Sequence, residues 1–409
     1  MCDFVTIYIS DLHHHDLNRS TLRVGLCIHM LLVYVQFTCL ACAVSLRDIR
    51  AMLLAELDSL KGTLSADVVE VVVSREDVYA TLLQLYRDDS SVATKQITVE
   101  FLNEYGQDAG GLTKDLFTSF WIEAFQKLFH GEDVVVPCLP LHRRKAEMPA
   151  LVTLGRILSH SVALTSVIPT RWSLVSLMVM MYGTDNSVPE SAVLQDFLLF
   201  LVPQERTLVR KALDNYSALV QSERELLCDL LQAHGLYSIP TAVNVAELVQ
   251  TLADDVIVHQ PALLCEQIRK GLPESHVDCF WSALTVPALQ AVYEQQRPTG
   301  QRLADSVVVA ADAMTNAQDT ALYRLRLFLS SLDQDEVEAF LLFATGSIHM
   351  PPQGLQVSFN NLSGALRRPI AHTCSNHLEL SVAYSSYQEF KRELKAVIHN
   401  PMCLQMTLV

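Results

Sequence analysis

From residue 53 to residue 130, the apolar positions change between helical and strand-like spacing. Valine fills five of the six positions from 68 to 73, a β-branched run that is typical of a strand. Ile97, Val99 and Phe101 alternate with other residues, so they share one face of a second strand. The pattern predicts helices over 53–60, 78–86 and 114–130, and strands over 68–73 and 97–102.

A glycine pair stands just before the third of these helices. Residues 107–113 follow the second strand closely and precede a broad apolar stripe. We interpret 107–113 as a strand-turn-helix joint, in which the glycines allow a positive φ and close packing. Thr113 is expected to cap the helix by accepting a hydrogen bond from a first-turn N–H.

The rest of the chain is mainly helical in pattern. Apolar residues recur every three or four positions from 150 to 231, with breaks at Pro169, at 183–189 and at Pro203. The polar stretch 295–301 contains Pro and Gly, so we place a domain boundary there. Further helices are predicted over 245–258, 263–269, 321–332, 335–344 and 387–399, and a strand over 355–359.

Composition indicates a globular protein and limits its partners. Half of the 409 residues are apolar, which is enough for a sizeable core and excludes a disordered chain. Thirty Lys and Arg against 45 Asp and Glu give a formal net charge of −15. This charge repels phosphate, so it argues against a nucleic-acid partner and in favour of basic protein surfaces.

The ten cysteines are spread thinly along the chain, a pattern that fits free thiols in a reducing compartment, the cytoplasm or the nucleus. Cys39 and Cys42 form a lone Cys-x-x-Cys without a second pair, which disfavours a zinc or redox site. The three histidines at 13–15 are interpreted as a solvated loop. Phosphate-loop, dinucleotide, serine-hydrolase and zincin motifs are missing, so neither a metal nor a cofactor is expected.

Residues 24–46 contain no charged side chain. This length suits a membrane span of about 20 residues, although His29, Gln36 and Thr38 interrupt the apolar run. Arginines on both sides leave the orientation undetermined. Three interpretations stay open: a membrane anchor, a cleaved signal peptide, and an extension outside the core.

One cysteine lies among polar groups. Cys374 sits in the stretch 367–380, which contains two arginines and two histidines, whereas Cys228, Cys265 and Cys279 lie in apolar helical surroundings. Positive charge near a thiol favours the thiolate, which is the nucleophilic form. Cys374 is therefore the candidate reactive cysteine, with an ordinary thiol as the alternative.

Four stretches carry motifs in a fixed order: Asp-Ala-Gly-Gly-Leu-Thr at 108–113, Leu-Gly-Arg-Ile-Leu at 154–158, a Thr-Gly-Ser segment within 343–354, and Ala-His-Thr-Cys at 371–374. The last, followed by Asn376 and Leu-Glu-Leu at 378–380, resembles the active-site loop of the HECT family of E3 ubiquitin ligases. The other three resemble the family's earlier segments. The resemblance runs from about residue 65 to the end of the chain.

The resemblance implies an α+β fold with two lobes. In such a bilobal HECT-like domain, a mostly helical N-lobe docks the E2 ubiquitin-conjugating enzyme, and a smaller α/β C-lobe carries the cysteine. A hinge joins the lobes. Applied to this chain, the resemblance implies an N-terminal extension at 1–60, an N-lobe at 61–296, a hinge at 297–301 and a C-lobe at 302–409.

The same resemblance implies an E3 ligase that needs no cofactor. Cys374 would accept ubiquitin from E2 as a thioester and pass it to a lysine of an unknown protein substrate. His372 and Thr373 match the family's loop and would shape it around the thioester carbonyl, and Asn376 would donate to that carbonyl as in an oxyanion hole. Ser375 and Ser381 depart from the family pattern, and the tail 401–409 lacks the usual phenylalanine.

Two other functions stay open. A catalytically weak or inactive HECT-like scaffold would bind E2 or ubiquitin without transfer, and the tail and the short stretch 111–155 favour it. The retained Thr373-Cys374 pair argues against it. A cysteine hydrolase acting on ubiquitin conjugates would need a base beside the thiol, and His372 and His377 are too close in sequence to make a typical dyad.

Overall fold

Two parallel strands open the described part of the chain in the computed structural model. The structure describes residues 55–104, 110–184, 188–309, 313–351 and 353–400. After a helix at 55–62, β1 (Ser65–Val73) pairs in parallel with β2 (Lys95–Phe101). Parallel strands need a crossover connection, and α4 (Val78–Asp88) provides it, flanked by the turns η1 (Arg75–Asp77) and η2 (Ser90–Thr94). The helix and strands predicted between 68 and 102 are confirmed.

The next helix, α5 (Gly111–Leu128), begins earlier than the sequence suggested. Gly110 occupies its N-cap position with a φ of 100°, a left-handed conformation that glycine adopts at little cost. The positive φ predicted for this joint is therefore confirmed, whereas the expected Thr113 cap is wrong. Because the chain turns into the helix at Gly110, Thr113 already lies inside the first helical turn and is buried.

Aromatic residues of α5 build the centre of the larger core. Trp121 packs edge-on to Phe120 and lies 6.1 Å from Trp172, measured between ring centroids. The antiparallel pair β3 (Phe129–Gly131) and β4 (Val135–Pro137) follows α5. Phe129 continues the aromatic row with a centroid distance of 5.0 Å to Trp172. This core therefore surrounds the side of α5 that carries its apolar stripe.

The helical region after β4 confirms the helices predicted between 150 and 269. The expected break at Pro203 is also confirmed: one helix ends at Phe200 and the next starts at Pro203, where the missing N–H of proline has no intrahelical partner to lose. The helices are α6 (Leu141–Thr165), α7 (Leu174–Tyr182), α8 (Glu190–Phe200), α9 (Pro203–Asn215), η3 (Tyr216–Ala218), α10 (Gln221–Ala233), α11 (Val245–Asp254), η4 (Asp255–His259), α12 (Ala262–Arg269), α13 (Glu274–His276), η5 (Val277–Trp281) and α14 (Val286–Gln296).

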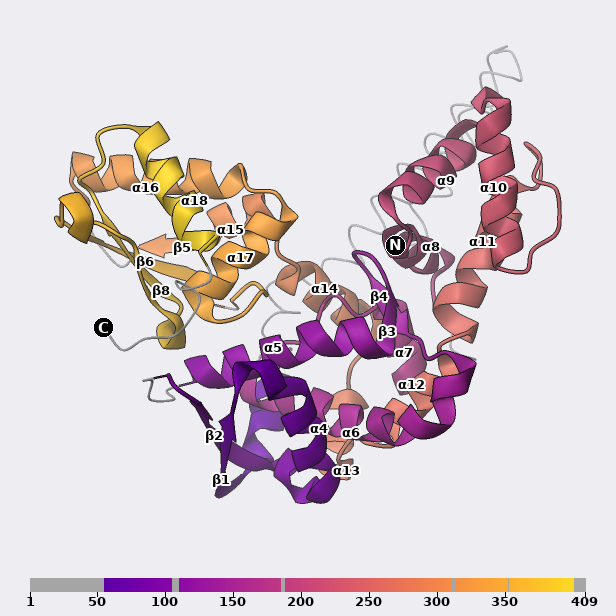
Figure 1. Ribbon diagram of the computed structural model, residues 1–409, viewed down its shortest axis with the longest axis horizontal. Helices are drawn as coiled ribbons and strands as arrows, with labels where there is room; N and C mark the ends of the chain where they lie inside the picture. Colours follow the sequence, from indigo (N-terminus) through magenta and orange to yellow (C-terminus); the bar gives the residue numbers. More distant parts are fainter. Residues whose placement is uncertain (1–54, 105–109, 185–187, 310–312, 352, 401–409) are drawn as a thin grey trace, which may run out of the picture. The chain divides into compact units, whose positions relative to one another are not determined.

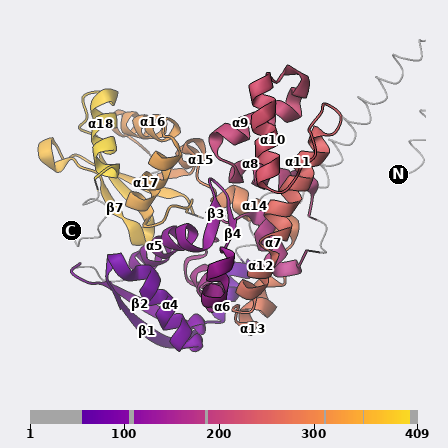
Figure 2. The same ribbon diagram turned by 45° about the vertical axis from the view of Figure 1, so that its right-hand side comes forward.

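A four-stranded sheet with helices beside it forms the C-terminal part. The strand order is β5-β6-β8-β7, with β6 parallel to both β5 and β8 and with β7 antiparallel to β8. α16 and α18 lie side by side next to this sheet in both views (Figures 1 and 2). The elements are α15 (Gly300–Asp305), β5 (Val307–Val309), α16 (Asn316–Ser330), α17 (Gln334–Thr345), β6 (Leu355–Asn360), η6 (Gly364–Leu366), β7 (Ile370–His372), η7 (Thr373–Ser375), β8 (His377–Ser381) and α18 (Tyr387–Ile398).

The fold is therefore a mixture of helices and small sheets with two groups of buried apolar residues. The larger group runs from Leu57 to Tyr293, and the smaller one runs from Leu303 to Ile398. Gln296, at the end of α14, is 4% exposed and is held by two hydrogen bonds: its Oε1 accepts from Ile168 N at 2.8 Å, and its Nε2 donates to Ser166 O at 3.0 Å. The end of α14 is thus fastened to the larger group just before the stretch 297–301.

Several sequence-based interpretations lie outside the described residues. These are the apolar segment 24–46, the histidines 13–15, the pair Cys39 and Cys42, and the tail 401–409. Within the ranges that the structure does describe, no helix combines the length and apolar character needed to cross a membrane.

Candidate active site

Cys374 lies at the tip of a β-hairpin. η7 joins β7 to β8, and His372 pairs with His377 at the base of the turn. Asn376 closes the turn with a φ of 51°, a left-handed conformation that asparagine tolerates better than most residues. Its backbone carbonyl accepts a hydrogen bond from Gln356 N on β6 at 2.9 Å. The thiol is therefore exposed on a turn whose closing residue is tied to the sheet.

Arg367, one of the two arginines near Cys374 in the sequence, has other partners. Its guanidinium contacts Glu389 at 2.6 Å and also Glu393, both on α18. Hydrogen bonds to these carboxylates raise the pKa of Arg367. The two carboxylates balance the charge of Arg367. Arg367 therefore connects the segment before β7 to α18 and does not make the cysteine turn electropositive.

The two histidines of the hairpin hold each other in place. His372 Nε2 lies 3.1 Å from Glu379 Oε1, and its ring stacks on His377 with a centroid distance of 5.4 Å. His377 Nε2 in turn lies 2.8 Å from Ser358 Oγ on β6. His372 is thus directed across the hairpin towards β8. This geometry suits a residue that orders the loop better than one that transfers a proton at Cys374.

On its other side, the cysteine turn lies against the first turn of α5. A Cβ added to Gly111 would stand 2.7 Å from Thr373 Oγ1 and 3.0 Å from Cys374 Sγ, so only glycine fits there without a shift. Lys114 Nζ donates a hydrogen bond to Asn376 Oδ1 at 3.0 Å, across 262 positions of sequence. The structure therefore brings Thr373, Cys374 and Asn376 together at the positive end of the α5 dipole.

Lys114 is the residue of this site that sequence reasoning missed. Burial lowers the pKa of Lys114, while attraction to the Cys374 thiolate acts in the opposite direction. No local pattern could reveal a contact between segments so far apart in the chain. The available hint was the position of a lysine in the first turn of a helix, where a cation opposes the helix dipole.

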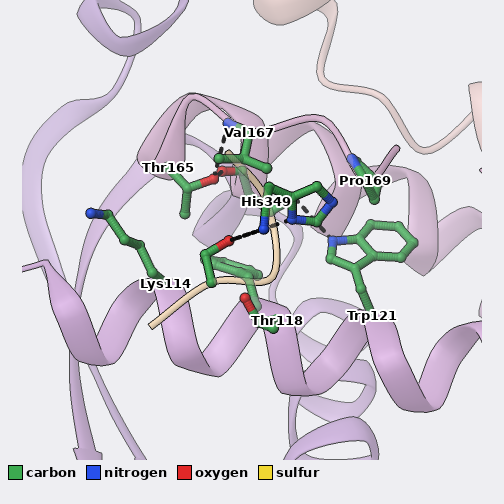
Figure 3. Close-up of a pocket in the computed structure, with 10 residues that line it drawn as sticks. Lys114, Thr118, Trp121, Thr165, Val167, Pro169 and His349 are labelled. Atoms are coloured by element: carbon green, nitrogen blue, oxygen red, sulfur yellow. Dashed lines mark hydrogen bonds between the residues drawn. The ribbon is translucent and has the colours of Figure 1, made fainter. Parts of the chain in front are cut away.

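A second contact surface continues along α5 from Lys114. Figure 3 shows His349 above the helix, near Thr118, Trp121 and Pro169, with the Lys114 ammonium pointing away from it. His349 Nε2 accepts from Thr170 N at 3.2 Å, and burial lowers the pKa of His349 to about 4, so the ring is neutral. The cavity here holds about 20 Å³, room for about one water molecule. It is a packed joint rather than a substrate pocket.

Exposure alone does not single out Cys374 among the cysteines. Cys138 is also exposed, whereas Cys265 is buried and its burial raises the pKa of the thiol. What distinguishes Cys374 is the contact of its turn with α5. Within the described ranges, no group of three or more His, Cys, Asp or Glu side chains is placed to hold a metal ion.

Comparison with known proteins identifies the family of this chain. The model of the HECT-domain (ubiquitin-transferase) family matches residues 178–405, which include Cys374. The chain is also similar to the bifunctional serine/threonine-protein kinase/NEDD4-like E3 ubiquitin-protein ligase of Dictyostelium discoideum, with 26% identity over 278 residues. That match covers 62% of this chain but only 13% of the relative. Because the family match extends over more than half of the sequence, the chain belongs to the HECT-domain family.

Proposed function

We propose that this protein is an E3 ubiquitin ligase that accepts ubiquitin from an E2 enzyme as a thioester on Cys374 and transfers it to a lysine of a protein substrate. The observation that carries the proposal is the position of Cys374: exposed, on a tight hairpin turn, and packed against the first turn of α5. Membership of the HECT-domain family supports the reaction class.

The chemistry needs a nucleophile and two acyl transfers. In the first, the Cys374 thiolate attacks the thioester carbonyl of the E2, a new C–S bond forms, and the E2 cysteine leaves as a thiolate. In the second, a substrate amine attacks the new thioester, loses a proton to solvent, and Cys374 leaves as a thiolate. Because thioester exchange is nearly isoenergetic, the protein chiefly supplies proximity and orientation.

The residues around Cys374 take supporting roles in this proposal. Thr373, packed against Gly111, fixes the turn. His372 orders the hairpin through Glu379. Asn376 donates to the oxyanion through its side-chain amide, since this residue comes two positions after Cys374 and its backbone carbonyl is hydrogen-bonded to β6.

We infer that residues 61–296 act as the E2-docking lobe, 297–301 as the hinge and 302–409 as the lobe that carries the cysteine. The larger group of buried apolar residues ends at Tyr293 and the smaller one begins at Leu303, which supports a division in this interval. Gln296 lies at the end of the larger part and is anchored to it. The substrate of the ligase is an unidentified protein.

The location that we propose is the cytoplasm or the nucleus, in keeping with exposed free thiols at Cys138 and Cys374. Membrane anchoring through 24–46 is the alternative. In that case the full-length protein should resist carbonate extraction from membranes. Recovery of the intact protein in a detergent-free soluble fraction would exclude the anchor.

A thioester assay tests the proposal directly. Mixed with E1, ATP, ubiquitin and a panel of E2 enzymes, the protein should gain one ubiquitin that a reducing agent removes, because added thiol exchanges with a thioester but not with an isopeptide. Cys374→Ser should abolish this adduct or convert it to a thiol-resistant ester. Cys138→Ser is the matched control, since it also removes an exposed thiol, and it should leave the adduct unchanged.

The other outcomes identify the competing functions. Binding of E2 by the wild-type protein without any adduct would mean an inactive scaffold. Release of free ubiquitin from conjugates without E2 would mean a cysteine hydrolase.

A further inference from the structure

Lys114 stands where a cation is unfavourable for the stability of its own helix. It is the fourth residue of α5, and positive charge in the first turn opposes the helix dipole. The ammonium is also half-buried, and burial lowers its pKa because the charged form loses solvation. Helix stability therefore does not explain a lysine at this position.

The contact of Lys114 determines how the Asn376 side chain is oriented. An ammonium can donate hydrogen bonds but cannot accept them. The atom of Asn376 that faces Lys114 at 3.0 Å must therefore be Oδ1, and the NH₂ group points away from Lys114. The backbone of Asn376 is fixed separately, because its N–H donates to Thr373 O at 3.3 Å and its carbonyl accepts from Gln356 N. Lys114 thus supplies the remaining restraint on this side chain.

Lys114 and Gly111 lie on the same face of α5, because residues three apart are neighbours on a helix. Gly111 is the residue that the Cys374 thiol approaches. The ammonium is therefore beside the cysteine turn, and its charge is attracted to the Cys374 thiolate. The Asn376 side chain that Lys114 holds therefore belongs to the same turn as the thiol.

We propose that Lys114 is a positioning residue for acyl transfer, which holds the Asn376 amide ready to donate to the oxyanion formed at the thioester carbonyl. This inference rests on the proposed ligase function. It assigns part of the transfer machinery to α5, far from Cys374 in the sequence.

Single-turnover transfer from a ubiquitin-charged E2 to the full-length protein tests the assignment. Lys114→Met keeps the length of the side chain but removes its donors, and it should slow transfer about tenfold or more. Lys114→Arg keeps a donor and should stay within about threefold of wild type. Lys145→Met, on α6, is the control, since Lys145 is an exposed lysine on a neighbouring helix.

Two further measurements separate positioning from a merely structural role. In a double-mutant cycle, Lys114→Met should have little further effect once Asn376→Ala is present, because Lys114 acts through Asn376. The thermal midpoint of Lys114→Met should be unchanged or higher, because the variant removes a half-buried charge from the positive end of a helix.

Several results would overturn the inference. If Lys114→Met transfers ubiquitin at the wild-type rate, or if its effect on the rate adds fully to that of Asn376→Ala, Lys114 does not act through Asn376. A fall in the thermal midpoint that accounts for the lost activity would make Lys114 structural. An absence of any adduct on the wild-type protein would instead overturn the proposed function itself, and with it this role of Lys114.

Discussion

Gly111→Ala should separate the stability of the protein from its transfer activity. The new methyl group would stand 2.7 Å from Thr373 Oγ1 and 3.0 Å from Cys374 Sγ, whereas ordinary contacts of this kind are 3.4 Å or longer. The cysteine turn must therefore retreat by roughly 0.7 Å from α5. A displacement of about 1 Å at a reacting group can slow an enzyme about a hundredfold, so we expect transfer to fall by about tenfold or more.

The same substitution should not destabilise the helix. Alanine is favoured over glycine in helices by at most about 1 kcal/mol, and Gly111 does not have the positive φ that makes Gly110 difficult to replace. Chemical denaturation should therefore give a free energy of unfolding equal to or slightly above that of the wild type. Single-turnover transfer from a ubiquitin-charged E2 measures the predicted fall in the rate of transfer.

Gly62→Ala is the matched control for this experiment. Gly62 is the last residue of the helix at 55–62, and a Cβ there would meet no atom within 4 Å. The control should transfer ubiquitin at the wild-type rate. If Gly111→Ala also transfers at that rate, the contact between α5 and the cysteine turn does not belong to the state that performs the reaction, and our reasoning about this site is refuted.

Three other predictions concern the fold and the thiols. Phe390→Ala should lower the free energy of unfolding by about 3–5 kcal/mol in denaturant titrations, because Phe390 is fully buried in the smaller group. In native protein, mass spectrometry should find iodoacetamide on Cys374 but not on Cys265 until denaturant is added. Burial lowers the pKa values of three histidines, so stability should be constant above about pH 6.5 and fall towards pH 4, by up to about 1.4 kcal/mol per pH unit for each group. These histidines are His160, with a pKa of about 3, and His276 and His349, each with a pKa of about 4. A series of denaturation experiments across this pH range measures how steeply the free energy of unfolding changes with pH. Replacing one of the three histidines by glutamine should make that change less steep.

Local patterns predicted most helices of this fold, because helical periodicity is carried by residues close in sequence. The helices α4 and α18 and the strands β1, β2 and β6 are where those patterns placed them. The strands β3, β4, β5, β7 and β8 were missed. All of them but β8 have only three residues, and pairing with neighbours in the sheet, rather than their own sequence, makes them strands.

The candidate site was likewise predictable only where it depends on residues that are close in sequence. Cys374 stood out because its neighbours are polar, and the turn around it carries the motif that resembles the family. Thr113 was given the capping role because the sequence could not show that the chain already turns at Gly110. Lys114 was missed because its partner Asn376 is distant in sequence and only the packing of the cysteine turn on α5 brings them together.

The distance in sequence between Lys114 and Asn376 also sets an order of events during synthesis. Chains are made at roughly 5–20 residues per second, so a separation of 262 residues corresponds to about 13–50 s between the two halves of the site. The first turn of α5 leaves the ribosome long before the thiol that it contacts. A newly made chain therefore acquires Gly111 and Lys114 long before the cysteine turn, and a product that ends before residue 374 would carry both of them without Cys374.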